Sequence, residues 1–250
     1  MKRYNSGTFY AISDIGLVRS DNEDSYLAKV NAFGDVLLCV SDGMGGRNKG
    51  DFASRFLVNG LQSSFDQLDK KFKNEKAIQK WIYKVVKTIN SEIFAKARMN
   101  KEYSKMGTTM SLCIISGDLL VTAQVGDSRI YSLENQQLAQ LSTDQSYAEY
   151  LIHSKKIDEE GAKSHPERHK ITNAIGIRKE CSVDFKNFMY FGQKIMLCTD
   201  GVYNNVSEND LEMILNSSDT PERKCKQLIS FANANGGSDN MAIIIWEGND

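Results

Sequence analysis

The chain has 250 residues, of which 41% are hydrophobic and 25% charged, the balance of a folded globular protein rather than of a disordered or fibrous one. Its formal net charge of −1 gives no electrostatic reason to expect binding to nucleic acid or to an anionic membrane. No stretch is apolar for long enough to span a membrane, and polar groups interrupt the first twenty residues, so we expect a cytoplasmic protein.

The order of predicted elements indicates an α+β layered fold rather than a doubly wound sheet. Apolar runs rich in β-branched residues predict strands at 10–13, 36–41, 109–115, 119–125, 129–133, 194–199 and 241–246. Apolar residues at three- and four-residue spacing predict helices at 52–68 and 78–94, and two more helices are expected at 208–215 and 221–234.

No Gly/Ser-rich linker or repeat divides the chain, so we expect one domain over residues 1–250. The segment 145–170 is polar and dense in charge, and we expect it to be a mobile surface insertion that could border a site. All three histidines, His153, His165 and His169, lie in it. The five cysteines are widely spaced, odd in number and mostly among apolar neighbours, as is typical of reduced core residues.

Several aspartates stand at the ends of predicted strands: Asp42, Asp127 and Asp200 follow strands, and Asp239 precedes the last one. Each alone is more typical of a turn, because Asp and Gly tolerate turn dihedrals. Their repetition favours a cluster, since strands of one sheet system can bring their ends together. Two carboxylates about 6 Å apart repel by roughly 3 kcal/mol at an effective dielectric near 20, so such a cluster requires divalent cations.

Oxygen ligands and the scarcity of histidine favour magnesium or manganese over zinc. Gly43, directly after Asp42, would let a backbone carbonyl approach a metal ion. Near the N-terminus, Arg19 could bind phosphate oxygens, and Glu23 and Asp24 could hold a second metal ion directly or through its waters. The alternative interpretation of this N-terminal segment is a charged surface loop.

These segments, in this order, resemble the metal-dependent serine/threonine protein phosphatases of the type 2C or PPM family, especially the compact bacterial form. The matching stretches are residues 13–24, 40–46, 107–109, 126–129, 165–166 with 171–176, 198–201 and 237–240. They cover nearly the whole chain, and although each is weak evidence alone, seven in the family's order are highly specific.

The resemblance implies a four-layer α-β-β-α sandwich, in which two mainly antiparallel sheets are flanked by helix pairs, with the segment 145–176 as a flap. It also implies two Mn²⁺ or Mg²⁺ ions. Of the expected ligands, Asp42 bridges both ions, and Asp200 and Asp239 complete the first site. The Gly43 carbonyl and Glu23 bind the second ion, which Asp24 contacts through a water molecule. Asp127 joins Asp200 at a weaker third site.

The implied activity is hydrolysis of phosphoserine and phosphothreonine in proteins by in-line attack of a metal-bridging hydroxide, with Arg19 on the substrate phosphate. We expect a monomer whose partners are phosphoproteins, among them a serine/threonine kinase and its targets. Two other functions stay open. One is a non-catalytic member that binds phosphoproteins or senses metal, and the other is a metal-dependent phosphodiesterase or nuclease.

The chain departs from the family pattern at three positions. Met44 stands where some members have a histidine thought to protonate the leaving group, so that acid is unassigned. Arg47 and Gln145 replace two further histidines that are often present in bacterial members. His165 and His169 could donate the proton if the flap folds over the cleft, but surface exposure is the favoured interpretation, and a metal-bound water could serve instead.

Overall fold

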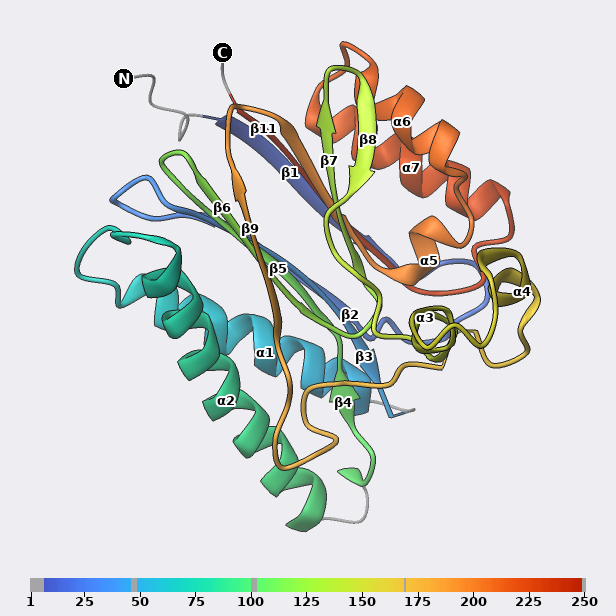
Figure 1. Cartoon of the computed structure of the whole chain (residues 1–250), viewed down its shortest axis with the longest axis horizontal. Helices are drawn as coiled ribbons and strands as arrows, with labels where there is room; N and C mark the ends of the chain where they lie inside the picture. Colours follow the sequence, from blue (N-terminus) through green and yellow to red (C-terminus); the bar gives the residue numbers. More distant parts are fainter. Residues whose placement is uncertain (1–6, 46–48, 100–102, 169, 249–250) are drawn as a thin grey trace.

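A computed structural model describes residues 7–45, 49–99, 103–168 and 170–248. Two sheets, both antiparallel throughout, form the centre of the molecule (Figure 1). The first has the strand order β1 (Gly7–Asp14), β11 (Met241–Gly248), β10 (Lys194–Cys198), β7 (Arg129–Glu134) and β8 (Gln137–Gln140). The second has the order β2 (Asp24–Val30), β3 (Val36–Met44), β5 (Met110–Ser116), β6 (Leu119–Val125) and β9 (Asp184–Met189), with β4 (Gly107–Thr108) paired to the end of β3.

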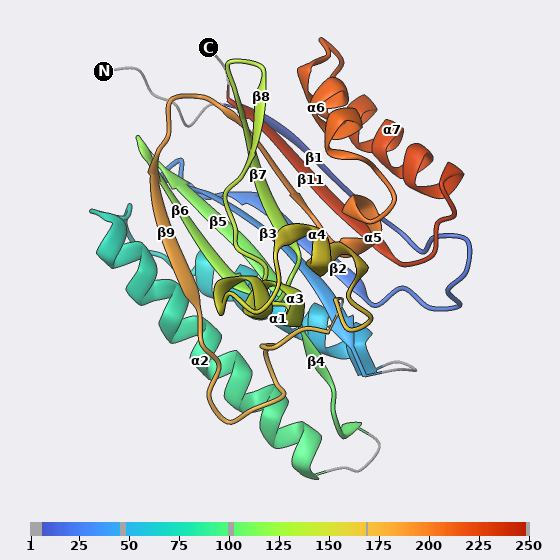
Figure 2. The same cartoon turned by 45° about the vertical axis from the view of Figure 1, so that its right-hand side comes forward.

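Helices cover the outer face of each sheet (Figures 1 and 2). The second sheet is covered by α1 (Lys49–Asp66) and α2 (Glu75–Met99), and the first by α6 (Glu208–Asn216) and α7 (Pro221–Ala234). Three short helices, α3 (Tyr147–His153), α4 (Glu159–Ser164) and α5 (Asp200–Tyr203), complete the described elements. The expected α-β-β-α sandwich is confirmed. No described helix has the length and apolar character needed to cross a membrane.

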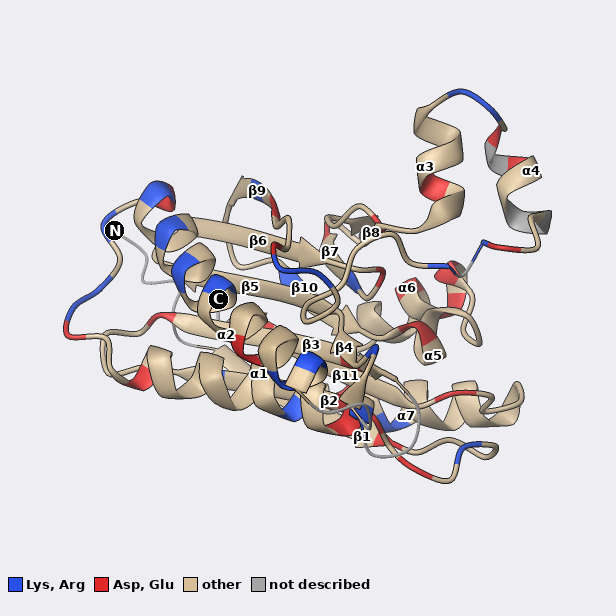
Figure 3. Ribbon diagram, turned by 90° about the horizontal axis from the view of Figure 1, so that it is seen from below, with Lys and Arg blue, Asp and Glu red and all other residues tan. Residues whose placement is uncertain are grey.

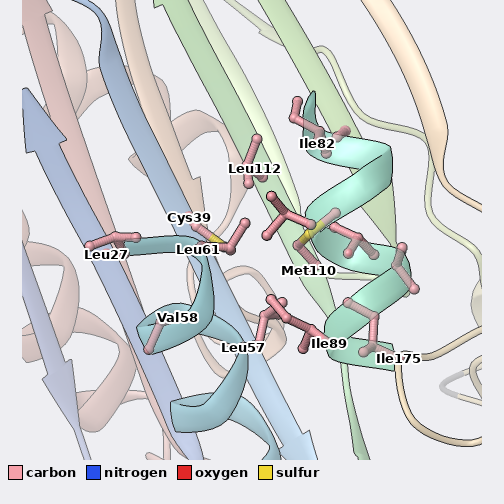
Figure 4. Close-up of a cluster of buried hydrophobic side chains, with 14 of the residues drawn as sticks. Leu27, Cys39, Leu57, Val58, Leu61, Ile82, Ile89, Met110, Leu112 and Ile175 are labelled. Atoms are coloured by element: carbon pink, nitrogen blue, oxygen red, sulfur yellow. The ribbon is translucent and has the colours of Figure 1, made fainter. Parts of the chain in front are cut away.

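Three apolar cores separate the four layers, because β3, β5, β10 and β11 are buried on both faces. Between the sheets, Leu38, Ile115, Leu197 and Ile244 share one core with Trp246. The other two cores lie under the helix pairs. Figure 4 shows the core under α1 and α2, where the labelled side chains from both helices meet those of the sheet.

The predicted strands and helices are all present, but four strands were missed: the two-residue β4 and the longer β2, β8 and β9. The three longer ones are edge strands of their sheets. An edge strand leaves one side to solvent, so its sequence carries polar residues that weaken the apolar signal. All five cysteines are free; Cys181 is half-buried and the other four are buried.

Asn90 on α2 holds the backbone of residues 176–179 in place through hydrogen bonds. Its side-chain amide donates to the carbonyls of Arg178 and Lys179 at 3.1 and 3.0 Å and accepts from the Gly176 amide at 2.8 Å. The side chain is 2% exposed, so water cannot replace these bonds.

We predict that Asn90→Ala lowers the free energy of unfolding by about 3 kcal/mol, because buried main-chain groups lose their partner. Denaturant unfolding measures the change. Ser91→Ala, at the exposed neighbouring position, is the control and should stay within about 0.5 kcal/mol of wild type. Equal stabilities of the two variants would contradict the assigned role of Asn90.

Candidate functional site

Asp42 lies near the end of the buried strand β3, between β2 on one side and the segment containing Thr109 on the other. The β2–β3 register places Asp24 directly opposite it. On the other side, the Asp42 amide donates to the Thr109 hydroxyl at 2.9 Å, and its carbonyl accepts from the Thr109 amide at 2.8 Å. The backbone at Asp42 is therefore fixed by both neighbouring segments.

The carboxyl of Asp42 faces a concentration of negative charge. Its pKa is raised well above the usual range, first by burial and then by repulsion from other carboxylates. In decreasing order of effect these are Asp24, Asp200, Asp127 and Asp239. Five acidic side chains thus lie near one another; four of them belong to the strand-end pattern, and Asp24 comes from the N-terminal segment.

The carboxyl groups near Asp42 also have raised pKa values. Burial raises the pKa of Asp200 to about 6, with added repulsion from Asp239. Burial raises the pKa of Asp127 to about 7, with added repulsion from Asp200. Burial also raises the pKa of Asp24 and, more moderately, that of Glu23. The fold holds these groups together at a cost in free energy when no positive charge is present.

Thr199 joins the two sheets at this point. Its hydroxyl donates to the Asp24 carboxylate at 2.6 Å and accepts from the Ala242 amide at 2.8 Å. Asp24 belongs to the second sheet and Ala242 to the first, so one hydroxyl fixes their separation. Sequence reasoning gave Thr199 no role; its place directly before Asp200 was the available signal.

Asn240 holds the loop that carries Arg19 and Glu23. Its amide nitrogen donates to the carbonyls of Ile15 and Asp21 at 3.0 and 2.9 Å, and its oxygen accepts from the Glu23 amide at 2.9 Å. The side chain is 6% exposed. Sequence reasoning placed Asn240 in a motif without seeing this function, because its three partners lie more than 200 residues away.

Arg19 is bonded to Asp239 at 2.7 Å, and its side chain remains 52% exposed. The loop on which it lies is packed against the segment containing Asp239, since Gly16 has a φ of +78° and a Cβ there would clash with the Asp239 and Gly237 carbonyls. The predicted phosphate-binding arginine is therefore brought to the edge of the carboxylate cluster.

Gly43 is required for close packing. A Cβ at Gly43 would clash with the backbone of Gly50, the second residue of α1, and with the Glu23 carbonyl. The amide of Gly50 in turn donates to the Glu23 carboxylate at 3.2 Å. The first turn of α1 thus packs closely against Glu23 and the end of β3. The free backbone amides of a helix start interact favourably with a negative charge such as that of Glu23.

The 145–176 segment begins beside Asp127. Gln145 accepts from the Gly126 amide at 2.9 Å and from the Asn173 side chain at 2.8 Å, so it ties both stems of the segment to the turn before Asp127. Arg129 forms an ion pair with Asp144 at 2.8 Å. A cavity of about 560 Å³ lies between this segment and the sheet, and its lining includes Asp127 and Arg129.

The two described histidines do not join the cluster. His165 packs against Tyr147 with ring centroids 5.6 Å apart, and His153 is exposed beside Glu149. Met44 is half-buried at the end of β3, paired with Gly107. Arg47 and His169 lie outside the described residues.

The donor set fits a hard divalent cation in chemistry and in charge, because it consists of carboxylate and main-chain oxygens that repel one another. As placed, however, no three Asp, Glu, His or Cys side chains of the described residues form a group tight enough to hold a metal ion. The carboxylates act on one another electrostatically without forming a closed ligand set.

Comparisons with known proteins show what the chain as a whole is similar to. The family model described as protein phosphatase 2C matches residues 18–242. The serine/threonine phosphatase stp of Listeria monocytogenes is 34% identical over 236 residues, which cover 94% of this chain and 93% of that protein. The protein phosphatase PhpP of Streptococcus pneumoniae is 28% identical over 240 residues, 96% of each chain.

Solved structures share the whole fold. The S. agalactiae serine/threonine phosphatase has a TM-score of 0.91 at 31% identity, covering 97% of this chain and 100% of that one. The catalytic domain of the phosphatase PstP, in complex with two manganese ions, has a TM-score of 0.84 at 29% identity, covering 98% and 99%. The chain therefore belongs to the protein phosphatase 2C family and is a serine/threonine phosphatase.

Proposed function

We propose that this phosphatase hydrolyses phosphoserine and phosphothreonine in proteins with the help of Mn²⁺ or Mg²⁺ held at the carboxylate cluster around Asp42. The observation that supports this proposal is the raised pKa of Asp42. This half-buried side chain faces four other carboxylates. Such repulsion is relieved by divalent cations, and the related PstP structure contains two manganese ions.

We assign the ligands as follows. Asp42 would hold both ions, Asp200 and Asp239 would complete the first site, and the Gly43 carbonyl and Glu23 would serve the second. Asp24, bonded to Thr199, supports the second site through water, and Asp127 joins Asp200 at a weaker third site. When bound, the ions lower the pKa of water and neutralise charge on the phosphoryl group, which supports in-line attack on phosphorus.

The remaining roles belong to the chain itself. Arg19 binds the substrate phosphate; it is half-exposed and donates to Asp239 from one nitrogen, so it can turn to a phosphate that offers two oxygens. With Met44 at the family's histidine position, no side chain is assigned as the donor of the leaving-group proton. The 145–176 segment acts as a flap within a single domain, and its cavity beside Asp127 receives substrate residues. A serine/threonine kinase and its targets are the proposed partners.

We predict that Asp239→Asn lowers manganese-dependent turnover of p-nitrophenyl phosphate and of a phosphothreonine peptide by about 100-fold or more, because a charged metal ligand is lost. Asp69→Asn, at an exposed position on the loop between α1 and α2, is the matched control and should keep wild-type activity. Manganese binding without turnover by the wild type would favour the metal-sensing alternative, and cleavage of single-stranded DNA would favour the nuclease.

We predict that Arg19→Ala raises the KM for a phosphothreonine peptide about tenfold or more while manganese affinity, measured by titration calorimetry, is retained. The control is Arg223→Ala, an exposed position on α7, which should leave both quantities unchanged. An equal loss of metal binding in Arg19→Ala would contradict the assignment of Arg19 to the phosphate.

The carboxylate cluster should make the stability of the chelated protein depend on pH. A carboxyl whose pKa is raised by folding stabilises the fold below its unfolded pKa of about 4, and this contribution is lost as the pH rises through the folded value. With the pKa of Asp127 at about 7, its titration should remove about 1 kcal/mol of unfolding free energy between pH 6 and pH 8.

Denaturant unfolding in chelator at both pH values measures this loss. Asp127→Asn should be more stable than the wild type at pH 8 and should depend less on pH, while manganese should stabilise the wild type. A chelated wild type that is equally stable at both pH values would show that the carboxylates do not repel one another as the structure indicates.

A further inference from the structure

The basic residues of this chain are unevenly distributed. Residues 67–99, which span α2 and the loop before it, contain nine Lys or Arg and three Asp or Glu, a net charge of +6. The rest of the chain therefore has a net charge of −7. The overall value of −1 hides a strongly basic element on an otherwise acidic protein.

Four lysines form one exposed face of α2. Lys76, Lys80, Lys84 and Lys87 are all exposed, and at 3.6 residues per turn they fall within an arc of about 80° that extends for roughly 17 Å along the helix. Figure 3 shows the basic residues of α2 in a row, at the end of the molecule away from α3 and α4. We call these four residues the α2 basic face.

The α2 basic face differs from the other charged helix surfaces. On α1, Arg55 forms an ion pair with Asp51, and on α7, Lys226 forms one with Glu222, both at i,i+4 spacing. Among the described residues, no ion pair or hydrogen bond involves the side-chain ammonium groups of the four lysines of the α2 basic face. Like charges at i,i+3 and i,i+4 spacing destabilise a helix by a few tenths of a kcal/mol per pair.

The opposite face of α2 already has a structural role. Ile78, Ile82, Val86 and Ile89 are buried against the second sheet. Packing thus fixes the direction in which the lysines point, and the core does not need their charge. The repulsion within the face would be relieved by a partner that brings negative charge.

We propose that the α2 basic face docks the protein on an anionic lipid surface. The face consists of lysines, whose ammonium groups on flexible side chains suit the spread-out negative charge of a lipid surface. A pocket for one carboxylate or phosphate group would be expected to use arginine, whose planar guanidinium binds two oxygens at once. Tyr83, 51% exposed on the same side of the helix, adds the amphipathic ring that is enriched at membrane surfaces. The three lysines of the preceding loop, Lys70, Lys71 and Lys73, extend the positive surface.

Docking through this face leaves the phosphatase site accessible. The α2 basic face lies on an outer layer, whereas the carboxylate cluster lies at the strand ends where Asp24 and Asp42 are paired. A protein held by α2 could therefore dephosphorylate substrates at the lipid surface, and its activity toward a small soluble substrate does not depend on the lysines.

Co-sedimentation with vesicles tests the proposal. The wild type is expected to bind vesicles of three parts phosphatidylcholine to one part phosphatidylglycerol at about 0.1 M salt, to dissociate at several-fold higher salt, and not to bind pure phosphatidylcholine. At about fivefold per lysine, Lys80→Gln/Lys84→Gln should weaken binding about thirtyfold. Lys155→Gln/Lys156→Gln, which removes the same charge from exposed positions after α3, should bind nearly as the wild type does.

Turnover of p-nitrophenyl phosphate and circular dichroism show that the α2 variant is folded, since both should match the wild type. No binding to the anionic vesicles, equal binding by the two double variants, or binding that is insensitive to salt would overturn the proposal. Binding to polyglutamate in the absence of vesicle binding would also overturn it, because the face would then fit an acidic protein segment.

Discussion

The mutual repulsion of carboxylates around Asp42 is the constraint on which the functional end of this protein depends. Burial and neighbouring negative charge raise the pKa of Asp42, Asp24, Asp127 and Asp200 together. An ordinary folded protein would separate or neutralise such groups. Their persistence in one place means that the surrounding structure must hold them there against a cost in free energy.

Hydrogen bonds made by uncharged side chains hold the cluster together. Thr199 fixes Asp24 against the first sheet, Thr109 fixes the backbone of Asp42, and Asn240 fixes the loop that carries Arg19. All three side chains are nearly or fully buried, so these bonds are not exchanged for water. Uncharged side chains thus provide most of the positioning of these charged groups.

The distribution of charge separates two surfaces of the molecule. Acidic groups gather at the strand ends, where a phosphatase needs cations, and lysines gather on α2 along an outer layer. The net charge of −1 describes neither surface. In this chain, electrostatic arguments about partners have meaning only once the helix faces are known.

The sequence by itself determined the layered fold, because the central strands are apolar on both faces and the helices repeat their apolar residues at helical spacing. It also identified the aspartates at the strand ends, since the change from apolar run to Asp and Gly is local. The edge strands β2, β8 and β9 could not be identified, because their solvent-facing residues weaken that pattern. Only the tertiary structure decided which of the aspartates face Asp42 and that Thr199 and Asn240 position them. Those contacts join residues far apart in the chain, and no local pattern records them.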